Sequence, residues 1–225
     1  VDIARTSEDA QTIAEANGAI VIVWGSYDDT AIDVYVEIGS LANVSGSVFT
    51  RDDLAEIADV RLTMSNPRRE SVVTSVVAAA NIVYSATSDP FNVAQNLVAL
   101  EIAAPTSPEV VGNGAAENWH RYIINYFADP EAGLGHLETA LSINQHPIYY
   151  LGQTLAYQKV GQFELVPETA QTAARLGPDN WALPDITTGQ HRLYFDNDLN
   201  AALDALNTAD ADLPDYWFLD MQIGG

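Results

Sequence analysis

The spacing of hydrophobic positions changes once along the chain. Residues 19–24 form an unbroken apolar run rich in β-branched side chains, and residues 31–39 alternate between apolar and polar side chains. An unbroken run is typical of a strand buried on both faces, whereas strict alternation is typical of a strand with one exposed face. The segment 25–30 between them predicts a turn. From about residue 70 the apolar positions recur at helical spacing, which predicts a helical remainder.

A short amphipathic helix is predicted ahead of the strands, over residues 6–17. A hydroxyl from Thr6 or Ser7 supplies the capping oxygen, and Gly18 ends the helix because glycine tolerates the left-handed conformation. Two strands by themselves are only marginally stable. We therefore expect a third strand to pair with them, either from residues 57–64 or from sequence ahead of the chain.

Paired helices are predicted to fill the second part of the chain. Asp-Pro dipeptides at Asp89 and Asp129 mark two helix starts, because a proline at the first helical position leaves no hydrogen bond unmade. Residues 106–114 predict a loop. The expected fold class is α+β, with a small sheet module at 1–68 and an all-α helical-repeat array at 69–225. The pairs recur with a period of about 34 residues, at about 72–106, 115–146, 147–180 and 183–216.

The pair at 147–180 carries the repeat pattern most clearly. Its first helix places a large, a small and an aromatic residue at Tyr150, Thr154 and Tyr157, and Gly161 interrupts the chain at the turn. The second helices of the last two pairs share a pattern of apolar packing positions, which are Phe163, Val166, Ala170 and Ala173 in one and Leu199, Ala202, Leu206 and Ala209 in the other.

On these residues, 115–216 resembles a short tetratricopeptide repeat (TPR) array, and 72–106 resembles a diverged first repeat. A small residue facing a large one lets two paired helices approach closely, so the pattern has a physical basis as well as a name. The first helix of the last pair departs from the repeat, because Pro184 and Gln190 stand where other residues are expected.

The opening sheet segment is similar to a small α/β module that precedes such repeats in bacterial multidomain proteins, akin to the N-terminal domain of TolB-like proteins. The residues that carry this resemblance are Ala19, Val23, Gly25, Tyr27 and the alternating strand at 31–39. The resemblance implies a module that performs no chemistry and either caps the array or carries an interaction.

The charge of the chain limits its partners. There are 31 acidic residues against 9 basic ones, which gives a net charge of −22. Such a surface repels nucleic acid and anionic lipid, and no apolar run reaches the roughly 18 residues that direct membrane insertion needs. The acidity fits a halophilic source, a secreted or cell-surface protein, or an acidic cytosolic one, and an extracytoplasmic or cell-surface location is favoured over the cytoplasm.

No catalytic or metal-binding motif is recognisable, so we expect no enzyme, no cofactor and no metal. Cysteine is absent, and the four histidines form no HExxH motif. Asp196 and Asp198 have the spacing of a calcium loop, but Ala201 and Asn207 stand where that loop needs glycine and glutamate. These aspartates are therefore interpreted as the start of a helix.

Aromatic and polar residues on the first helices are the candidate binding residues. In a TPR array the first helices line a concave groove, so the resemblance implies that some of these side chains contact a bound peptide. The alternative for each is packing between repeats, which we expect for Tyr150 and Tyr157, whereas Tyr149, Gln153 and Arg121 are candidates to face the groove; the sequence does not separate the two sets. The candidates are Arg121, Tyr122, Tyr149, Gln153, Tyr157 and His191.

The expected function is protein–protein interaction: a scaffold module that binds a peptide or partner segment, of basic character given the acidic field. The alternative is a self-assembling structural subunit of an extracellular or cell-surface polymer, joined through a strand edge or an open end of the array. Trp217, Phe218 and Leu219 are the candidate assembly residues. In a monomeric binder, these residues would instead cap the last repeat within the chain.

Overall fold

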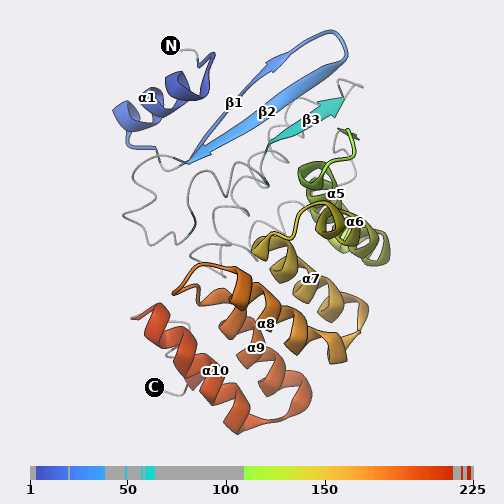
Figure 1. Cartoon of the computed structure of the whole chain (residues 1–225), viewed down its shortest axis with the longest axis vertical. Helices are drawn as coiled ribbons and strands as arrows, with labels where there is room; N and C mark the ends of the chain where they lie inside the picture. The colour runs from blue at the N-terminus through green and yellow to red at the C-terminus, as the bar shows by residue number, and fades with distance from the viewer. Residues whose placement is uncertain are drawn as a thin grey trace. The chain divides into compact units, whose positions relative to one another are not determined.

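The chain is an α+β protein, which confirms the expected fold class. Its structure is a computed structural model that describes residues 4–19, 21–38, 49, 57, 59–63, 109–214, 219 and 222–223. The chain divides into two compact units, which we call the sheet unit (Val1–Asn144) and the helical unit (Gln145–Gly225). Figure 1 shows the strands and helices of both units. The boundary expected at residue 68 and the helix pair expected at 72–106 lie outside the described residues.

The first helix, α1 (Ser7–Asn17), begins and ends as predicted. Thr6 is the N-cap, since its hydroxyl accepts a hydrogen bond from the Asp9 amide at 3.1 Å. Gly18 ends the helix in the left-handed conformation with φ of 61°. The hydroxyl of Ser7, the other capping candidate, donates to the buried Glu37 carboxylate and so ties the start of α1 to the second strand.

In the part of the chain that the structure describes, four antiparallel strands form one sheet in the order β1-β2-β3-β4. They are β1 (Val21–Tyr27), β2 (Ala31–Ile38), β3 (Val60–Thr63) and β4 (Val110–Val111). The third strand comes from within 57–64, which confirms that prediction. The fourth strand lies in the segment 106–114 that was predicted to be a loop. Its two residues are too few to show an alternating pattern, so only their pairing with β3 defines them as a strand.

The first strand differs from its prediction in burial and length. β1 lies at one end of the described strand order, its residues 21–24 are half-buried and 25–27 are exposed, so it is not buried on both faces. The strand also continues to Tyr27, which leaves a shorter turn than 25–30. Gly25 permits this continuation, because a Cβ there would lie 2.0 Å from the Asp33 carbonyl oxygen.

One face of the sheet packs against the helix α5 (Ala115–Ala128). Side chains from three strands form its buried cluster, with Ile124 of α5 packed against them, and they are Val34, Val60, Leu62 and Val110. The helix α6 (Pro130–Ile143) packs on α5 and begins with Asp129, whose carboxylate accepts from the Ala132 amide at 3.1 Å. The helix pair predicted at 115–146 therefore forms, and it belongs to the same compact unit as the sheet.

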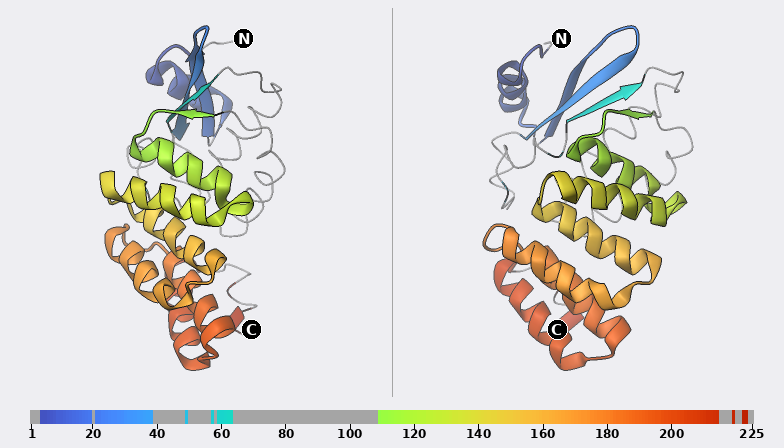
Figure 2. Two further views of the ribbon diagram at one scale, coloured as in Figure 1. Left: turned by 90° about the vertical axis from the view of Figure 1, so that its right-hand side faces the viewer. Right: turned by 45° about the vertical axis from the view of Figure 1, so that its right-hand side comes forward.

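The helical unit is a series of helices in which each packs against the next (Figure 2). They are α7 (Pro147–Val160), the 3-10 turn η3 (Phe163–Leu165), α8 (Val166–Leu176), α9 (Leu183–His191), the π-helical turn η4 (Arg192–Asp196) and α10 (Leu199–Asp212). Gly161 ends α7 with φ of 79°, as predicted. Gly189 lets α9 approach α10 closely, because a Cβ there would lie 2.6 Å from Cγ of Leu206.

The core of the last helix pair includes Leu219, near the end of the chain. Leu219 is completely buried with Ile186 and Leu206, and Leu213 and Ile223 pack against this cluster. Leu219 therefore packs within the chain, as expected of a residue that caps the last repeat and not of one exposed for assembly. Trp217 and Phe218, the other two candidate assembly residues, lie outside the described residues.

Candidate protein-binding surface

Three of the six predicted binding residues are buried. Tyr122, Tyr149 and His191 expose at most 3% of their surface, so none of them offers a side chain to a groove. For Tyr149 the packing alternative holds, because its side chain is fully buried. Tyr149 lies on the same stripe of α7 as the buried Gly152 and Ala156, at spacings of three and seven, which is the stripe that a helix turns toward its neighbours.

Arg121 and Tyr122 hold the sheet unit together. The Arg121 guanidinium donates to the carbonyl oxygens of Val110 at 2.8 Å and Gly112 at 2.5 Å, and so ties β4 to α5. The Tyr122 ring packs against Trp119 with 5.2 Å between ring centroids, and burial raises the pKa of its hydroxyl well above the usual value. Both residues therefore have structural roles in the described contacts.

Gln153 and Tyr157 are the predicted residues that remain accessible on a helix of the helical unit. Both are half-buried and lie four positions apart on α7, with Tyr150 on the same side of the helix. The structure thus brings these two predicted residues together on one helix face. We call Tyr150, Gln153 and Tyr157 the α7 face.

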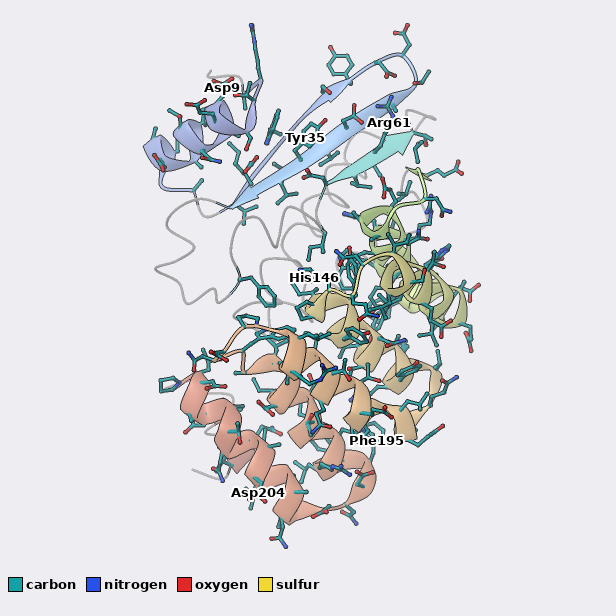
Figure 3. The ribbon with its side chains drawn as sticks, in the orientation of Figure 1. Asp9, Tyr35, Arg61, His146, Phe195 and Asp204 are labelled. Atoms are coloured by element: carbon teal, nitrogen blue, oxygen red, sulfur yellow. The ribbon has the colours of Figure 1, made fainter. Side chains whose placement is uncertain are left out.

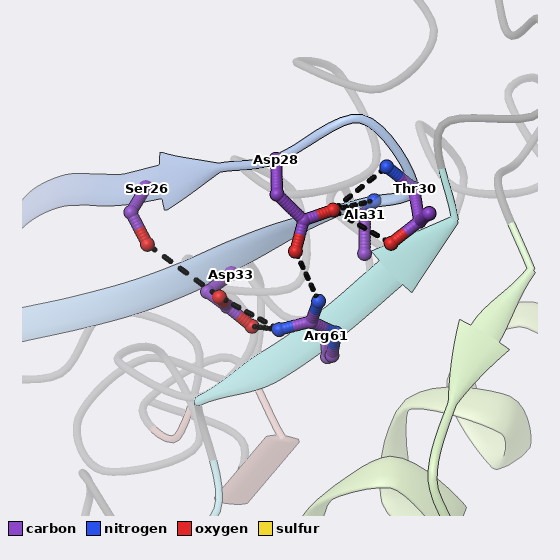
Figure 4. A network of polar contacts seen from close by, with 6 residues as sticks. All are labelled: Ser26, Asp28, Thr30, Ala31, Asp33 and Arg61. Atoms are coloured by element: carbon purple, nitrogen blue, oxygen red, sulfur yellow. Dashed lines mark hydrogen bonds and ion pairs between the residues drawn. The ribbon is translucent and has the colours of Figure 1, made fainter.

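A polar network joins the tip of the β1-β2 hairpin to β3 (Figure 4). One carboxylate oxygen of Asp28 accepts from the Thr30 amide at 2.7 Å, from the Thr30 hydroxyl and from the Ala31 amide, while the other accepts from Arg61 at 2.7 Å. Arg61 also donates to both oxygens of Asp33, at 2.8 and 2.9 Å. The bonds from Thr30 are the main cause that lowers the pKa of Asp28.

This polar network is explained by the turn and the strand pairing that it stabilises. Asp33 and Arg61 are opposite each other in the β2-β3 register, so their side chains share one face of the sheet. Asp28 occupies the turn position at which a short acceptor side chain bonds the backbone two and three residues on. The acceptors and donors of the network bond one another, and we assign it no ligand.

The aromatic cluster of the helical unit consists of Phe163, His191 and Phe195. Phe163 and Phe195 stack with ring centroids 4.4 Å apart, and Phe195 stacks on His191 at 5.3 Å. Phe163 comes from η3 and Phe195 from η4, so two turns of the unit supply the rings. Phe195 is labelled in Figure 3.

Exposed apolar side chains are frequent in the segments that supply this cluster. Among the described residues seven large apolar side chains are exposed, and four belong to η3 or to the segment from η4 to the start of α10. The four, with their exposed fractions, are Phe163 (36%), Tyr194 (64%), Phe195 (50%) and Leu199 (59%). Solvent-exposed aromatic area concentrated in this way is typical of an interaction site.

The π-helical turn η4 determines how Phe195 is displayed. Arg192 and Asp196, at its two ends, form an ion pair at 2.6 Å. Asn197 follows in the left-handed conformation with φ of 59°, and the Asp198 amide donates to the Arg192 carbonyl at 2.9 Å. Short π-helical turns are rare and occur often at functional sites.

His191 lies beneath the exposed rings at the end of α9. Its Nε2 is 3.6 Å from an Asp196 carboxylate oxygen, while its Nδ1 is enclosed and has no hydrogen-bond partner among the described residues. Burial lowers the pKa of His191 below its ordinary value of 6.5, and this outweighs the opposing effect of Asp196. The ring is therefore neutral at neutral pH.

Sequence reasoning named one member of the cluster, His191, as a binding residue and missed the others. Phe163 was expected to pack a second helix, and Tyr194 and Phe195 were not singled out. The available signal was an adjacent aromatic pair directly before the Asp196 to Asp198 helix start, where polar residues are the rule. Asp198 caps α10 by accepting from the Ala201 amide at 3.1 Å, which confirms the interpretation of these aspartates as a helix start.

Comparison with protein-family models, with curated proteins and with solved structures finds no match to this chain. The TPR array and the TolB-like module therefore stay predictions, while the α+β class is shown by the structure itself. In the part of the chain that the structure describes, no group of three or more His, Asp or Glu side chains is placed to hold a metal ion. No helix within the same residues has the length and apolar character to cross a membrane.

Proposed function

We propose that the chain is a non-enzymatic protein-interaction module, of the TPR type, whose helical unit binds a segment of a partner protein. The observation that carries this proposal is the aromatic cluster with its exposed neighbours. Exposed rings on a rigid helical framework supply contact area with little loss of side-chain freedom, which is the property of interaction hot spots. The consecutive packing of α7, α8, α9 and α10 supports the helical-repeat interpretation.

Two surfaces of the helical unit are candidates for the contact. The α7 face is where the TPR resemblance places a bound peptide, and Gln153 and Tyr157 are accessible there. The aromatic cluster lies instead at the turns that follow α7 and α9. It has the larger exposed apolar side chains, so we assign the main contact to the aromatic cluster.

A self-assembling structural subunit is the second candidate function. In the described part of the sheet, β1 is an edge strand, and its sequence VIVWGSY contains none of the charges or prolines that normally protect such an edge. The burial of Leu219 argues against assembly through that residue. A structural role would therefore use β1.

Site-specific photo-crosslinking tests both surfaces in the full chain. A photoreactive phenylalanine analogue is placed at Phe195, at Tyr157 or, as the matched control, at Leu176, which is also an exposed apolar residue of the helical unit. We expect a discrete adduct with another protein from position 195 and none from position 176. An adduct from 157 alone would move the contact to the α7 face, and adducts from neither 195 nor 157 would contradict the proposed function.

A further inference from the structure

The residues around the aromatic cluster carry an excess of negative charge. Residues 145–225 contain eleven acidic side chains and three basic ones. Three of the acidic residues adjoin members of the cluster in sequence: Glu164 follows Phe163 directly, and Asp196 and Asp198 follow Phe195. All three residues are exposed.

The two positive groups next to Phe195 in sequence do not offset this charge. Arg192 is already paired with Asp196 at 2.6 Å. His191 is neutral at neutral pH because burial lowers its pKa. Glu164 and Asp198 are exposed, have no described ion pair and follow the half-exposed rings closely in sequence, although the Asp198 carboxylate also accepts from the Ala201 amide.

Rings and carboxylates at one place favour a partner that is both apolar and cationic. An apolar side chain gains by covering the exposed parts of Phe163 and Phe195. A Lys or Arg gains from the negative ring faces and from the carboxylates around them. An acidic segment would meet repulsion from a chain whose net charge is −22.

We propose that the aromatic cluster binds a basic segment of a partner protein, with an apolar side chain against Phe163 and Phe195 and a Lys or Arg beside Glu164 and Asp198. This inference rests on the proposed function and gives the partner its chemistry. A second copy of this chain fits the cluster poorly, because two surfaces of the same negative sign would be brought together.

Fluorescence anisotropy with short labelled peptides tests the chemistry directly on the full chain. The probe is a synthetic peptide with leucine at its centre and lysines on both sides. One matched peptide has glutamate for each lysine, and another has serine for the leucine. We expect either replacement to weaken binding at least about tenfold, and we expect added salt to weaken the lysine–leucine peptide because exposed charges are screened.

Variants of the chain separate the two contributions. Phe195→Ser removes an exposed ring, and Leu176→Ser is its control at an exposed residue elsewhere in the unit. Glu164→Lys reverses a charge beside the cluster, and Asp204→Lys makes the same net change on the exposed side of α10. We expect about tenfold weaker binding from Phe195→Ser and from Glu164→Lys, and little change from either control. If circular dichroism shows that Phe195→Ser is unfolded, the comparison of Glu164→Lys with Asp204→Lys remains as the test of the inference.

Several results would overturn the inference. One is that the glutamate peptide binds as tightly as the lysine peptide, and another is that no peptide binds at all. A third is that Asp204→Lys weakens peptide binding as much as Glu164→Lys does. A fourth is that the chain dimerises and that Phe195→Ser abolishes the dimer. A crosslinked partner whose contact segment is acidic would also overturn it while leaving the proposed function intact. Failure of crosslinking from positions 157 and 195 would instead remove the function itself.

Discussion

The tip of the β1-β2 hairpin and the aromatic cluster are both exposed at the surface. They differ in how far their side chains already have bonding partners within the chain. At the hairpin, Arg61 meets Asp28 and Asp33 in short ion pairs within 2.9 Å. At the cluster, Phe195 leaves half of its surface in water, and the enclosed Nδ1 of His191 has no partner among the described residues.

We use this difference, in place of charge or motif, to separate the structural site at the hairpin from the proposed binding site at the cluster. A cluster of ionisable residues attracts attention in a sequence, but ionisable groups that satisfy one another have little left to offer a ligand. Exposed rings beside carboxylates leave apolar surface in contact with water, and a partner can cover that surface.

The largest expected effect is on the hairpin, from Gly25→Ala. The added Cβ would lie 2.0 Å from the Asp33 carbonyl oxygen, so the backbone of β1 or β2 must move. We expect a loss of about 2–3 kcal/mol in the free energy of unfolding of the sheet unit, measured by urea denaturation. Gly135→Ala on α6 is the control, because nothing lies within 4 Å of its added Cβ. Equal stability of the two variants would contradict the close approach at Gly25.

The second prediction is that a mutation at either site changes one property of the protein and leaves the other unchanged. Phe195→Ser should weaken partner binding about tenfold with little change in melting temperature, because the side chain is half-exposed. Arg61→Met should leave partner binding unchanged while loosening the hairpin, since the hydrogen bonds to Asp28 and Asp33 are lost. Crosslinking yield and amide hydrogen exchange of β2 measure the two effects. Loss of partner binding in Arg61→Met would contradict the claim that the hairpin network takes no part in binding.

Local sequence rules predicted the elements that local physics determines. The cap at Thr6, the left-handed Gly18 and the Asp129 and Asp198 helix starts each depend on a few neighbouring residues, and each forms as predicted. The third strand was found because a hairpin alone is marginal.

Features that depend on distant residues were not predictable in the same way. The strand at Val110–Val111 is defined by β3 and by the Arg121 guanidinium, neither of which is adjacent in sequence. Tyr149 and Tyr150 have the same side chain, and only the packing of α7 decides which of the two is buried. The contact of Phe163 with Phe195 joins two turns about thirty residues apart, and no sequence period signals it.

The third prediction concerns pH and the ring beneath the cluster. The pKa of His191 in the folded chain is below 6.5 because burial disfavours the charged ring. As the pH falls through 6.5, His191 takes up a proton in the unfolded state before it does so in the folded state. The contribution of the neutral ring to the free energy of unfolding is therefore fully present above that pH, and it is lost as the pH falls toward the folded pKa. We expect the protection factor of the α9 amides, which is their exchange relative to the intrinsic rate at the same pH, to fall on acidification, measured by hydrogen-exchange mass spectrometry.

His191→Phe provides the test of this assignment. It removes the titrating group while keeping an aromatic ring against Phe195, so the loss of α9 protection on acidification should shrink. His136, whose pKa is also lowered by burial and by Arg121, belongs to the sheet unit. His136→Phe should change the pH response of α6 and leave that of α9 as it was. An unchanged α9 response in His191→Phe would show that another group controls it.

The smallest expected effect should be the same in both units. Asp129 and Asp198 cap α6 and α10 through bonds of the same length, 3.1 Å, to the amide three residues on. Replacement of either by alanine should cost about 1 kcal/mol of unfolding free energy, measured by urea denaturation. Asp198 also adjoins Phe195, so Asp198→Ala should weaken partner binding, whereas Asp129→Ala should not. If the two caps cost the same and binding changes only with Asp198, the difference between the units lies in the exposed rings and their carboxylates and not in how firmly their helices begin.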